Sequence, residues 1–196
     1  DTLISLSSMD TGASAEICFP VEVLNADIGN VAIFDLKTTY SFQHSEFNIP
    51  KIIGQVTEDW ETGTLKKFNW LLNGKKWWKL DSTYVYEGKY SVRSGKISDN
   101  DSTTLSLKYT ALLNDTISFY YKVSSESNFD FLKFYIDDFM LGKWSGETDW
   151  TKVTFPVIPG KHTFIWKYQK DVAIKSGLDA AFVDLINLPS LLLTTV

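Results

Sequence analysis

The sequence is poor in the residues that build disulfide-bonded or zinc-stabilised folds. Its 196 residues include one cysteine, Cys18, and two histidines, His44 and His162. One cysteine cannot form an internal disulfide bond, and this set cannot supply a zinc site of cysteine and histidine ligands. No apolar run approaches the roughly 20 residues that a membrane-spanning helix requires. We therefore expect no insertion into a membrane.

Positive charge is also scarce, because 19 Lys and Arg stand against 24 Asp and Glu, for a net charge of −5. This balance argues against a basic nucleic-acid binder. The run Lys75-Lys-Trp-Trp-Lys79 resembles a nucleic-acid patch in isolation, but it is short. We interpret it as a strand with outward lysines.

Aromatic residues are abundant, at 15 % of the chain with seven Trp, and provide ample material for a core. Apolar side chains recur at every second position, the period of a half-buried strand, and turn residues bound these segments. No sustained helical stripe is present. The sequence therefore predicts an all-β chain. The clearest strands are expected within 105–109, 116–123, 132–136, 153–157 and 164–168.

Two units are expected. Weaker alternation over 17–23, 31–39 and 47–53 predicts only three or four strands, too few to bury both faces of a sandwich. The acidic and aromatic stretch 55–63 then marks a boundary, so we place a smaller, incomplete β unit at 1–56 and a sandwich at 57–190. The chain starts at Asp1 with no basic and apolar leader, and we expect a processed product or a fragment.

Several motifs in the second unit resemble those of adhesin-type jelly-roll modules of secreted bacterial proteins, which are related to the cleaved-adhesin domains of gingipain-type cysteine peptidases and more distantly to MAM domains. The match covers nearly all of 58–188. It rests on Glu58–Gly63, Tyr86–Ser91, Ser98–Ser102, Ile117–Val123, Phe129–Asp137, Trp144–Glu147, Trp150, Pro159–Phe164 and Phe182–Asp184.

The resemblance implies an antiparallel β-sandwich of jelly-roll type, and it implies that 1–56 is the end of an Ig-like domain. It also implies a secreted or cell-surface protein of Gram-negative bacteria. Such a module sits beside a catalytic or adhesive partner and contacts carbohydrate, host protein or neighbouring domains. It does not imply catalysis.

The residues themselves offer little for catalysis. A hydrolytic triad needs a nucleophile, a base and an orienting group. His162 begins a predicted strand next to a turn, so we interpret it as a partly buried, hydrogen-bonded side chain. Cys18 has no activating motif and is interpreted as structural. Without a phosphate loop, a dinucleotide fingerprint or a zinc motif, the chain is predicted not to be an enzyme.

Carboxylates suggest a calcium site. Asp59 and Glu61 have the same parity on the expected first strand of the sandwich, and Asp184 has inward parity on the expected last strand. In related jelly rolls these two strands lie close together and can hold calcium. Asp99, in the loop 98–101, could supply a further oxygen ligand. The alternative is that these acids accept hydrogen bonds from backbone amides or pair with Arg93.

A second acidic group suggests carbohydrate binding. Glu126 and Asp130 precede one predicted strand, and Glu147 and Asp149 precede another. The latter two lie between Trp144 and Trp150. An aromatic ring can pack on the apolar side of a sugar while carboxylates accept its hydroxyl groups. The favoured alternative is that the two tryptophans are buried beneath ordinary loops.

Two functions therefore remain open. The first is a non-catalytic adhesive or ligand-binding module that recognises carbohydrate or protein through loops at one end of the sandwich. The second is a structural accessory domain that supports the catalytic domain of a secreted gingipain-type peptidase. An exposed aromatic platform favours the first, and a large apolar patch on 1–56 favours the second.

Overall fold

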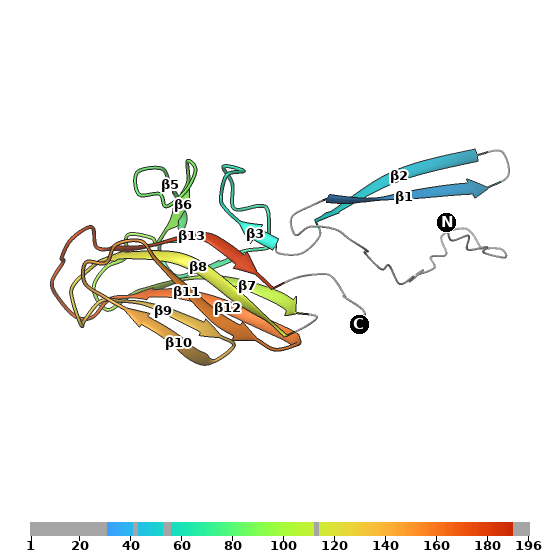
Figure 1. Ribbon diagram of the computed structural model, residues 1–196. Coiled ribbons are helices and arrows are strands. Elements are labelled where there is room, and N and C mark those ends of the chain that lie inside the picture. The colour runs from blue at the N-terminus through green and yellow to red at the C-terminus, as the bar shows by residue number, and fades with distance from the viewer. Residues whose placement is uncertain (1–30, 41–42, 53–55, 112–113, 190–196) are drawn as a thin grey trace.

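A computed structural model describes residues 31–40, 43–52, 56–111 and 114–189, with side chains from residue 56 onward. Every regular element in these ranges is a β-strand (Figure 1). Among the described residues, no helix is long and apolar enough to cross a membrane.

The second unit is a sandwich of two antiparallel sheets (Figure 1). The five-stranded sheet has the order β10-β9-β12-β7-β4, and the other has the order β11-β8-β13-β6-β5, with β3 added to β13. The strands are β3 (Val56–Glu58), β4 (Leu71–Asn73), β5 (Lys79–Asp81), β6 (Ser91–Arg93), β7 (Ser102–Ala111), β8 (Asp115–Ser124), β9 (Phe131–Ile136), β10 (Phe139–Trp144), β11 (Thr151–Val157), β12 (Gly160–Gln169) and β13 (Ala180–Leu188).

The core lies between these two sheets and is strongly aromatic. Trp166 of β12 has no exposed surface and contacts Phe119 of β8 across the sandwich, with ring centroids 5.3 Å apart. Phe134 of β9 lies 4.8 Å from the same Phe119 ring. Alternate residues of each strand thus meet at the centre, as the period of two requires.

The five long alternating segments are confirmed as β7, β8, β9, β11 and β12. The strand expected at 75–79 is wrong, because β4 ends at Asn73 and β5 begins only at Lys79. The connecting segment buries Trp78 and leaves Trp77 64 % exposed. One buried and one exposed tryptophan resemble the alternation of a strand, but the segment between Asn73 and Lys79 is a bent connection and not a strand.

Strand β13 carries a bulge, and the bulge changes which of its residues point into the core. Its pairing with β8 shifts register between Asp184 and Asn187, and Leu185 has a φ of 45°. Val183 before the bulge and Ile186 after it both belong to the core. Simple parity had predicted that Asp184 shares the inward face of Ile186. The bulge between them removes this relation, so that prediction was wrong.

The first unit contains a hairpin of β1 (Val31–Tyr40) and β2 (Gln43–Ile52). Strand pairing joins these two only to each other among the described residues. Cys18 and the strand expected at 17–23 lie outside the described residues, so the Ig-like identity of 1–56 stays a prediction. Strand β3, which pairs with β13, already begins at Val56.

Candidate functional site

The two residues expected on the first strand do not lie on a strand. β3 ends at Glu58, and Asp59 and Glu61 lie in the turn that follows. Asp59 pairs with the Lys67 ammonium at 3.1 Å. This turn forms because Trp60 adopts a φ of 61° and its backbone amide donates to the buried Glu58 carboxylate at 3.1 Å. The prediction of shared parity for Asp59 and Glu61 was wrong for this reason.

Glu61 holds a neighbouring loop by hydrogen bonds. Its Oε1 accepts from the backbone amides of Lys89 and Tyr90 at 2.8 and 3.0 Å. Gly88, with a φ of 72°, presses against the same carboxylate, where a Cβ atom would collide with it. Glu61 thus has the alternative role that the sequence left open, an acceptor for backbone amides.

Asp184 holds the same loop from the other side. Its Oδ2 accepts from the backbone amides of Tyr86 and Glu87 at 2.9 and 3.3 Å, and its Oδ1 accepts from Leu185 at 2.7 Å. Burial raises the pKa of Asp184 to about 6. The three amides lower this pKa, and the charge of the nearby Glu61 raises it, but burial has the largest effect. Asp184 therefore positions the loop that carries Tyr86.

Asp99 lies in a different environment. Its Oδ1 is 3.1 Å from the ammonium of Lys170, whose side chain has no exposed surface. Lys170 also lies 2.7 Å from Asp179. Burial lowers the pKa of Lys170, but the contacts with Asp179 and Asp99 and the charge of Asp130 together raise it above its ordinary value. The four residues expected to bind calcium are thus spread over separate contacts, and calcium binding by them stays a prediction.

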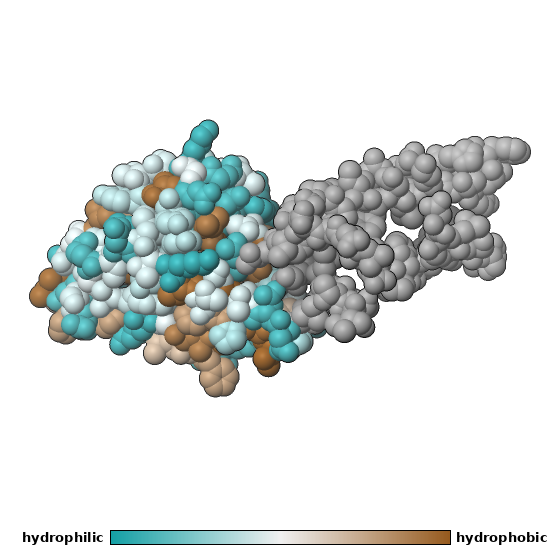
Figure 2. Space-filling view, in the orientation of Figure 1, coloured by the Kyte–Doolittle hydropathy of each residue, from teal (hydrophilic) through white to brown (hydrophobic). Residues whose placement is uncertain are grey.

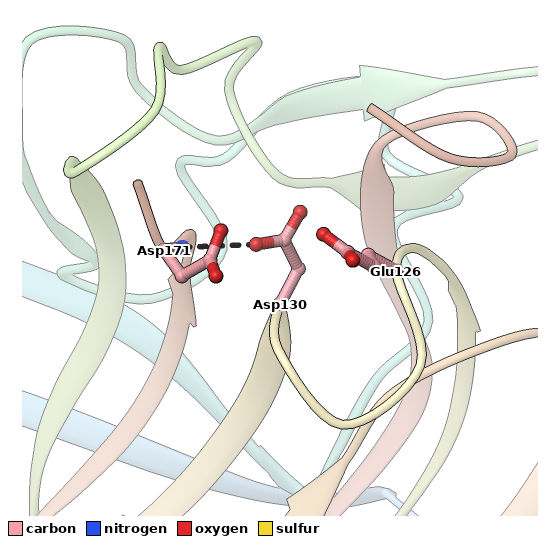
Figure 3. Close-up of side chains that lie close together, drawn as sticks. All are labelled: Glu126, Asp130 and Asp171. Carbon is pink, nitrogen blue, oxygen red and sulfur yellow. Dashed lines mark hydrogen bonds between the residues drawn. The ribbon is translucent and has the colours of Figure 1, made fainter. Parts of the chain in front are cut away.

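The structure gathers a different set of carboxylates. Glu126 and Asp130 from the β8–β9 loop and Asp171 just after β12 place oxygen atoms within 4.8 Å of one another (Figure 3). We call these three residues the acidic cluster. Oδ1 of Asp130 accepts a hydrogen bond from the backbone amide of Asp171 at 2.9 Å, drawn dashed in Figure 3.

The acidic cluster is short of compensating partners. Asp130 is fully buried, and its Oδ2 has no hydrogen bond, since Lys170 is 3.9 Å away. Oε2 of Glu126 is also buried without a partner. Burial raises the pKa of both carboxyls. The charge of Asp171 raises the pKa of Glu126 further, whereas the hydrogen bond from the Asp171 amide lowers that of Asp130 without cancelling the effect of burial. Such a cluster can share a proton or accept a cation that prefers oxygen ligands.

An aromatic surface lies on the outer face of the sheet that contains β8 and β13. Tyr86 stacks on Tyr120 of β8, with ring centroids 3.6 Å apart and planes 15° apart, and Trp150 meets the Tyr86 ring edge-on at 6.1 Å. We call these three residues the aromatic surface. Tyr86 is 40 % exposed, and the carboxylate of Asp149 beside Trp150 is 96 % exposed and 3.7 Å from the Lys122 ammonium.

The structure separates the six residues expected to bind a ligand. Trp144 is half-buried, stacks on Tyr121 at 4.2 Å and packs against the core, as the alternative interpretation held. Asp130 has no exposed surface, so its expected contact with a sugar is wrong. Glu126 joins the acidic cluster, and Glu147 accepts a hydrogen bond from Ser124. Of the six residues, Trp150 belongs to the aromatic surface and Asp149 lies beside it.

His162 is a hydrogen-bonded structural residue, as expected. Its Nδ1 lies 3.0 Å from Asp137 Oδ2, and its Nε2 lies 2.9 Å from the carbonyl oxygen of Ile158. Asp137 raises the pKa of His162 and His162 lowers that of Asp137, so each favours the charged form of the other.

Sequence reasoning missed Tyr86, Tyr120 and Asp171. Tyr120 stands between the core residues Phe119 and Tyr121, so strand alternation alone could have placed it on the outer face. Tyr86 lies in a loop whose path depends on Asp184. Asp171 reaches the acidic cluster only through the pairing of β12 with β9, which local sequence does not encode.

The comparisons with known proteins identify the fold. No protein-family model and no curated protein matches the chain. A cleaved adhesin domain of Lys-gingipain from Porphyromonas gingivalis has a similar structure, with a TM-score of 0.54, 12 % identity, 69 % of this chain covered and 98 % of that one.

Two solved carbohydrate-binding modules are also similar. TmCBM61, in complex with β-1,4-galactotriose, gives a TM-score of 0.49 at 16 % identity and covers 67 % of this chain and 94 % of that one. The CBM22-1 xylan-binding domain from Paenibacillus barcinonensis gives 0.47 at 18 % identity, with 67 % and 90 % covered. The second unit is therefore an all-β sandwich with the fold of adhesin-type jelly-roll modules.

Proposed function

We propose that this chain is a non-catalytic, carbohydrate-binding module of a secreted or cell-surface protein. The observation that carries this proposal is the aromatic surface. The exposed Tyr86 ring, supported by the half-buried rings of Tyr120 and Trp150, offers an apolar platform for one side of a sugar ring. The Asp149 carboxylate and the Lys122 ammonium beside Trp150 can hydrogen-bond the hydroxyl groups.

Contacts within the protein hold two rings of the aromatic surface in place. Tyr86 is fixed by stacking and by the bond from its own amide to Asp184, and Tyr120 projects from the middle of β8. A ligand therefore does not have to order these rings, which lowers the entropic cost of binding. This rigidity supports a binding role.

The alternative is a structural accessory domain of a gingipain-type peptidase. The apolar patch on 1–56 that would favour it involves side chains outside the described residues. Figure 2 shows the hydrophobic surface of the sandwich in this view as separate patches among hydrophilic ones. We favour the binding role because the aromatic surface carries it.

Binding to a panel of neutral oligosaccharides, measured by calorimetry, tests the proposal. We expect Tyr86→Ala and Trp150→Ala each to weaken binding by about tenfold or more, because each removes a stacking ring. Trp77→Ala is the matched control, because Trp77 is 64 % exposed but lies in the β4–β5 connection. Absence of any bound sugar, or an equal loss with Trp77→Ala, contradicts the proposal.

We also propose that the folded chain binds calcium. Melting temperature should then rise with millimolar calcium and fall with a chelator, since an ion that binds only the folded state stabilises it. Asp184→Asn removes the response if the ion lies where the sequence suggested, and Glu126→Gln removes it if the ion lies at the acidic cluster. Magnesium should substitute poorly because of its stricter geometry. A melting temperature that calcium and chelator leave unchanged would end this proposal.

A further inference from the structure

Charge is divided unequally between the two sheets. The strands of the five-stranded sheet, β4, β7, β9, β10 and β12, contain no Asp or Glu. They carry five lysines: Lys108, Lys133, Lys143, Lys161 and Lys167. This arrangement occurs in a chain whose net charge is −5, so the outer face of this sheet differs in sign from the molecule as a whole.

Three of these lysines lie side by side in one row. Lys143 of β10 is directly opposite Lys133 of β9, and Lys133 is directly opposite Lys167 of β12. Directly opposite residues of antiparallel strands share a face, and neighbouring strands are about 4.8 Å apart. We call these three residues the lysine row. Its residues face outward, because Leu132 and Phe134 on either side of Lys133 are buried in the core.

The lysine row is unfavourable for the isolated fold. Like charges directly opposite each other on a sheet destabilise it. Burial lowers the pKa of Lys133, and the charges of Lys167 and Lys143 lower it further. No carboxylate among the described residues forms an ion pair with any of the three.

Neighbouring side chains hold two of these three ammonium groups in place. Lys143 Nζ lies 3.8 Å and Lys133 Nζ 5.8 Å from the centre of the Phe131 ring, and Lys133 also donates to Gln169 Oε1 at 3.1 Å. These contacts keep the charges of Lys133 and Lys143 close together, although repulsion alone would separate them. An unpaired, preorganised row of positive charge fits an anionic ligand with regularly spaced charges.

We propose that the lysine row is a second binding surface, which takes an acidic polysaccharide bearing carboxylate or sulfate groups. Hydroxyl side chains of β7 extend the same face, since Thr104 is opposite Lys167. They suit a ligand that carries hydroxyl groups between its charges. The choice of a polysaccharide over another polyanion rests on the proposed function, whereas the anionic character of the ligand does not.

Binding of the full chain to polygalacturonate and to dextran sulfate, measured by biolayer interferometry at low and moderate salt, tests this inference. We expect binding that weakens as salt rises. The variant Lys133→Gln/Lys143→Gln/Lys167→Gln should lose about tenfold or more in affinity. Its melting temperature should be equal to or above that of the wild type, because repulsion is removed.

The matched control is Lys79→Gln/Lys89→Gln/Lys96→Gln, which removes the same charge from exposed lysines outside the five-stranded sheet. We expect it to bind nearly as the wild type does. An equal loss in both variants, or unchanged binding in the first, overturns the inference. Duplex DNA bound as tightly as both polysaccharides at the same salt overturns the choice of a polysaccharide.

The two proposals fail separately. Trp150→Ala should weaken binding of neutral oligosaccharides and leave binding of the acidic polysaccharides unchanged. If no neutral sugar binds but the lysine-row variant loses the acidic ligands, the aromatic surface fails and the lysine row stands. If Trp150→Ala alone abolishes both, one site serves both ligands and the lysine row is overturned.

Discussion

At the scale of the residue, Asp184 should make stability depend on pH. Its pKa is about 6 in the folded state, above the ordinary value of 3.8. The folded state therefore binds this proton more tightly than the unfolded state, so the free energy of unfolding falls as pH rises from about 4 to about 6. We expect Asp184 to contribute a fall on the order of 1–3 kcal/mol over that range.

Urea unfolding of the wild type and of Asp184→Asn at several pH values between 4 and 7 isolates this contribution. The variant cannot titrate at residue 184, so the free energy of unfolding of the wild type relative to the variant should decline across that range. Asp149→Asn, at a side chain that is 96 % exposed, is the control and should follow the wild-type profile. A wild-type-to-variant difference that does not change with pH would contradict the assigned pKa.

Residue types were easier to predict than residue partners. The sequence suggested a special role for Asp184 because a carboxylate on a buried strand must be compensated. The compensation is three backbone amides, from Leu185 and from a loop nearly 100 residues earlier in the chain. The bulge at Leu185 also broke the parity used to orient Asp184. Neither the loop path nor the bulge leaves a local signal in the sequence.

At the scale of the element, Gly95 should control how the segment after β6 packs against the β4–β5 connection. A Cβ atom there would lie 2.8 Å from the carbonyl oxygen of Trp77 and still closer to that of Lys76. Gly95→Ala should therefore lower the free energy of unfolding by about 1–3 kcal/mol, the usual cost of overpacking. Thermal unfolding measures it, with the exposed neighbour Lys96→Ala as a control expected within about 0.5 kcal/mol of the wild type.

Long strands could be predicted from the local sequence, whereas short strands could not. β7, β8 and β12 have ten residues each and contain alternating segments of five to eight residues, so the sequence predicted them. β4, β5 and β6 have three residues each, too few for a period of two to be distinguished from chance. They exist because neighbouring strands offer pairing partners, and this depends on the whole fold.

At the scale of the whole molecule, the segregation of charge links fold to function. The five-stranded sheet presents lysines outward and has no Asp or Glu in its strands, whereas the strands of the other sheet carry both signs. Its acids are Glu58 and Asp184, which are buried, and Asp81 and Asp115, and its cations are Lys79, Arg93, Lys122 and Lys152. The two sheets share one core but offer solvent different chemistry. Together with the aromatic surface on the sheet that holds Tyr120, this division would give the two outer faces different ligands.

The sandwich should be stable without the first unit, provided that β3 is kept. Val56 and Glu58 are buried, and β3 pairs with the end of β13. Glu58 also accepts hydrogen bonds from the Trp60 amide and from the Trp70 indole at 3.0 Å. A chain that starts at residue 55 retains all of these contacts, so its melting temperature should lie close to that of the full chain.

A chain that starts at residue 60 tests directly whether β3 stabilises the sandwich. It loses β3, exposes the edge of β13 and leaves the Trp70 indole without the Glu58 acceptor. Removing a buried strand and a buried hydrogen-bond acceptor should cost several kcal/mol, so this fragment should melt well below the one that starts at 55. Equal melting temperatures for the two fragments would show that β3 adds nothing to the sandwich. A large loss already at 55 would show that 1–54 belongs to the same cooperative unit, and the boundary expected from the sequence would then be wrong.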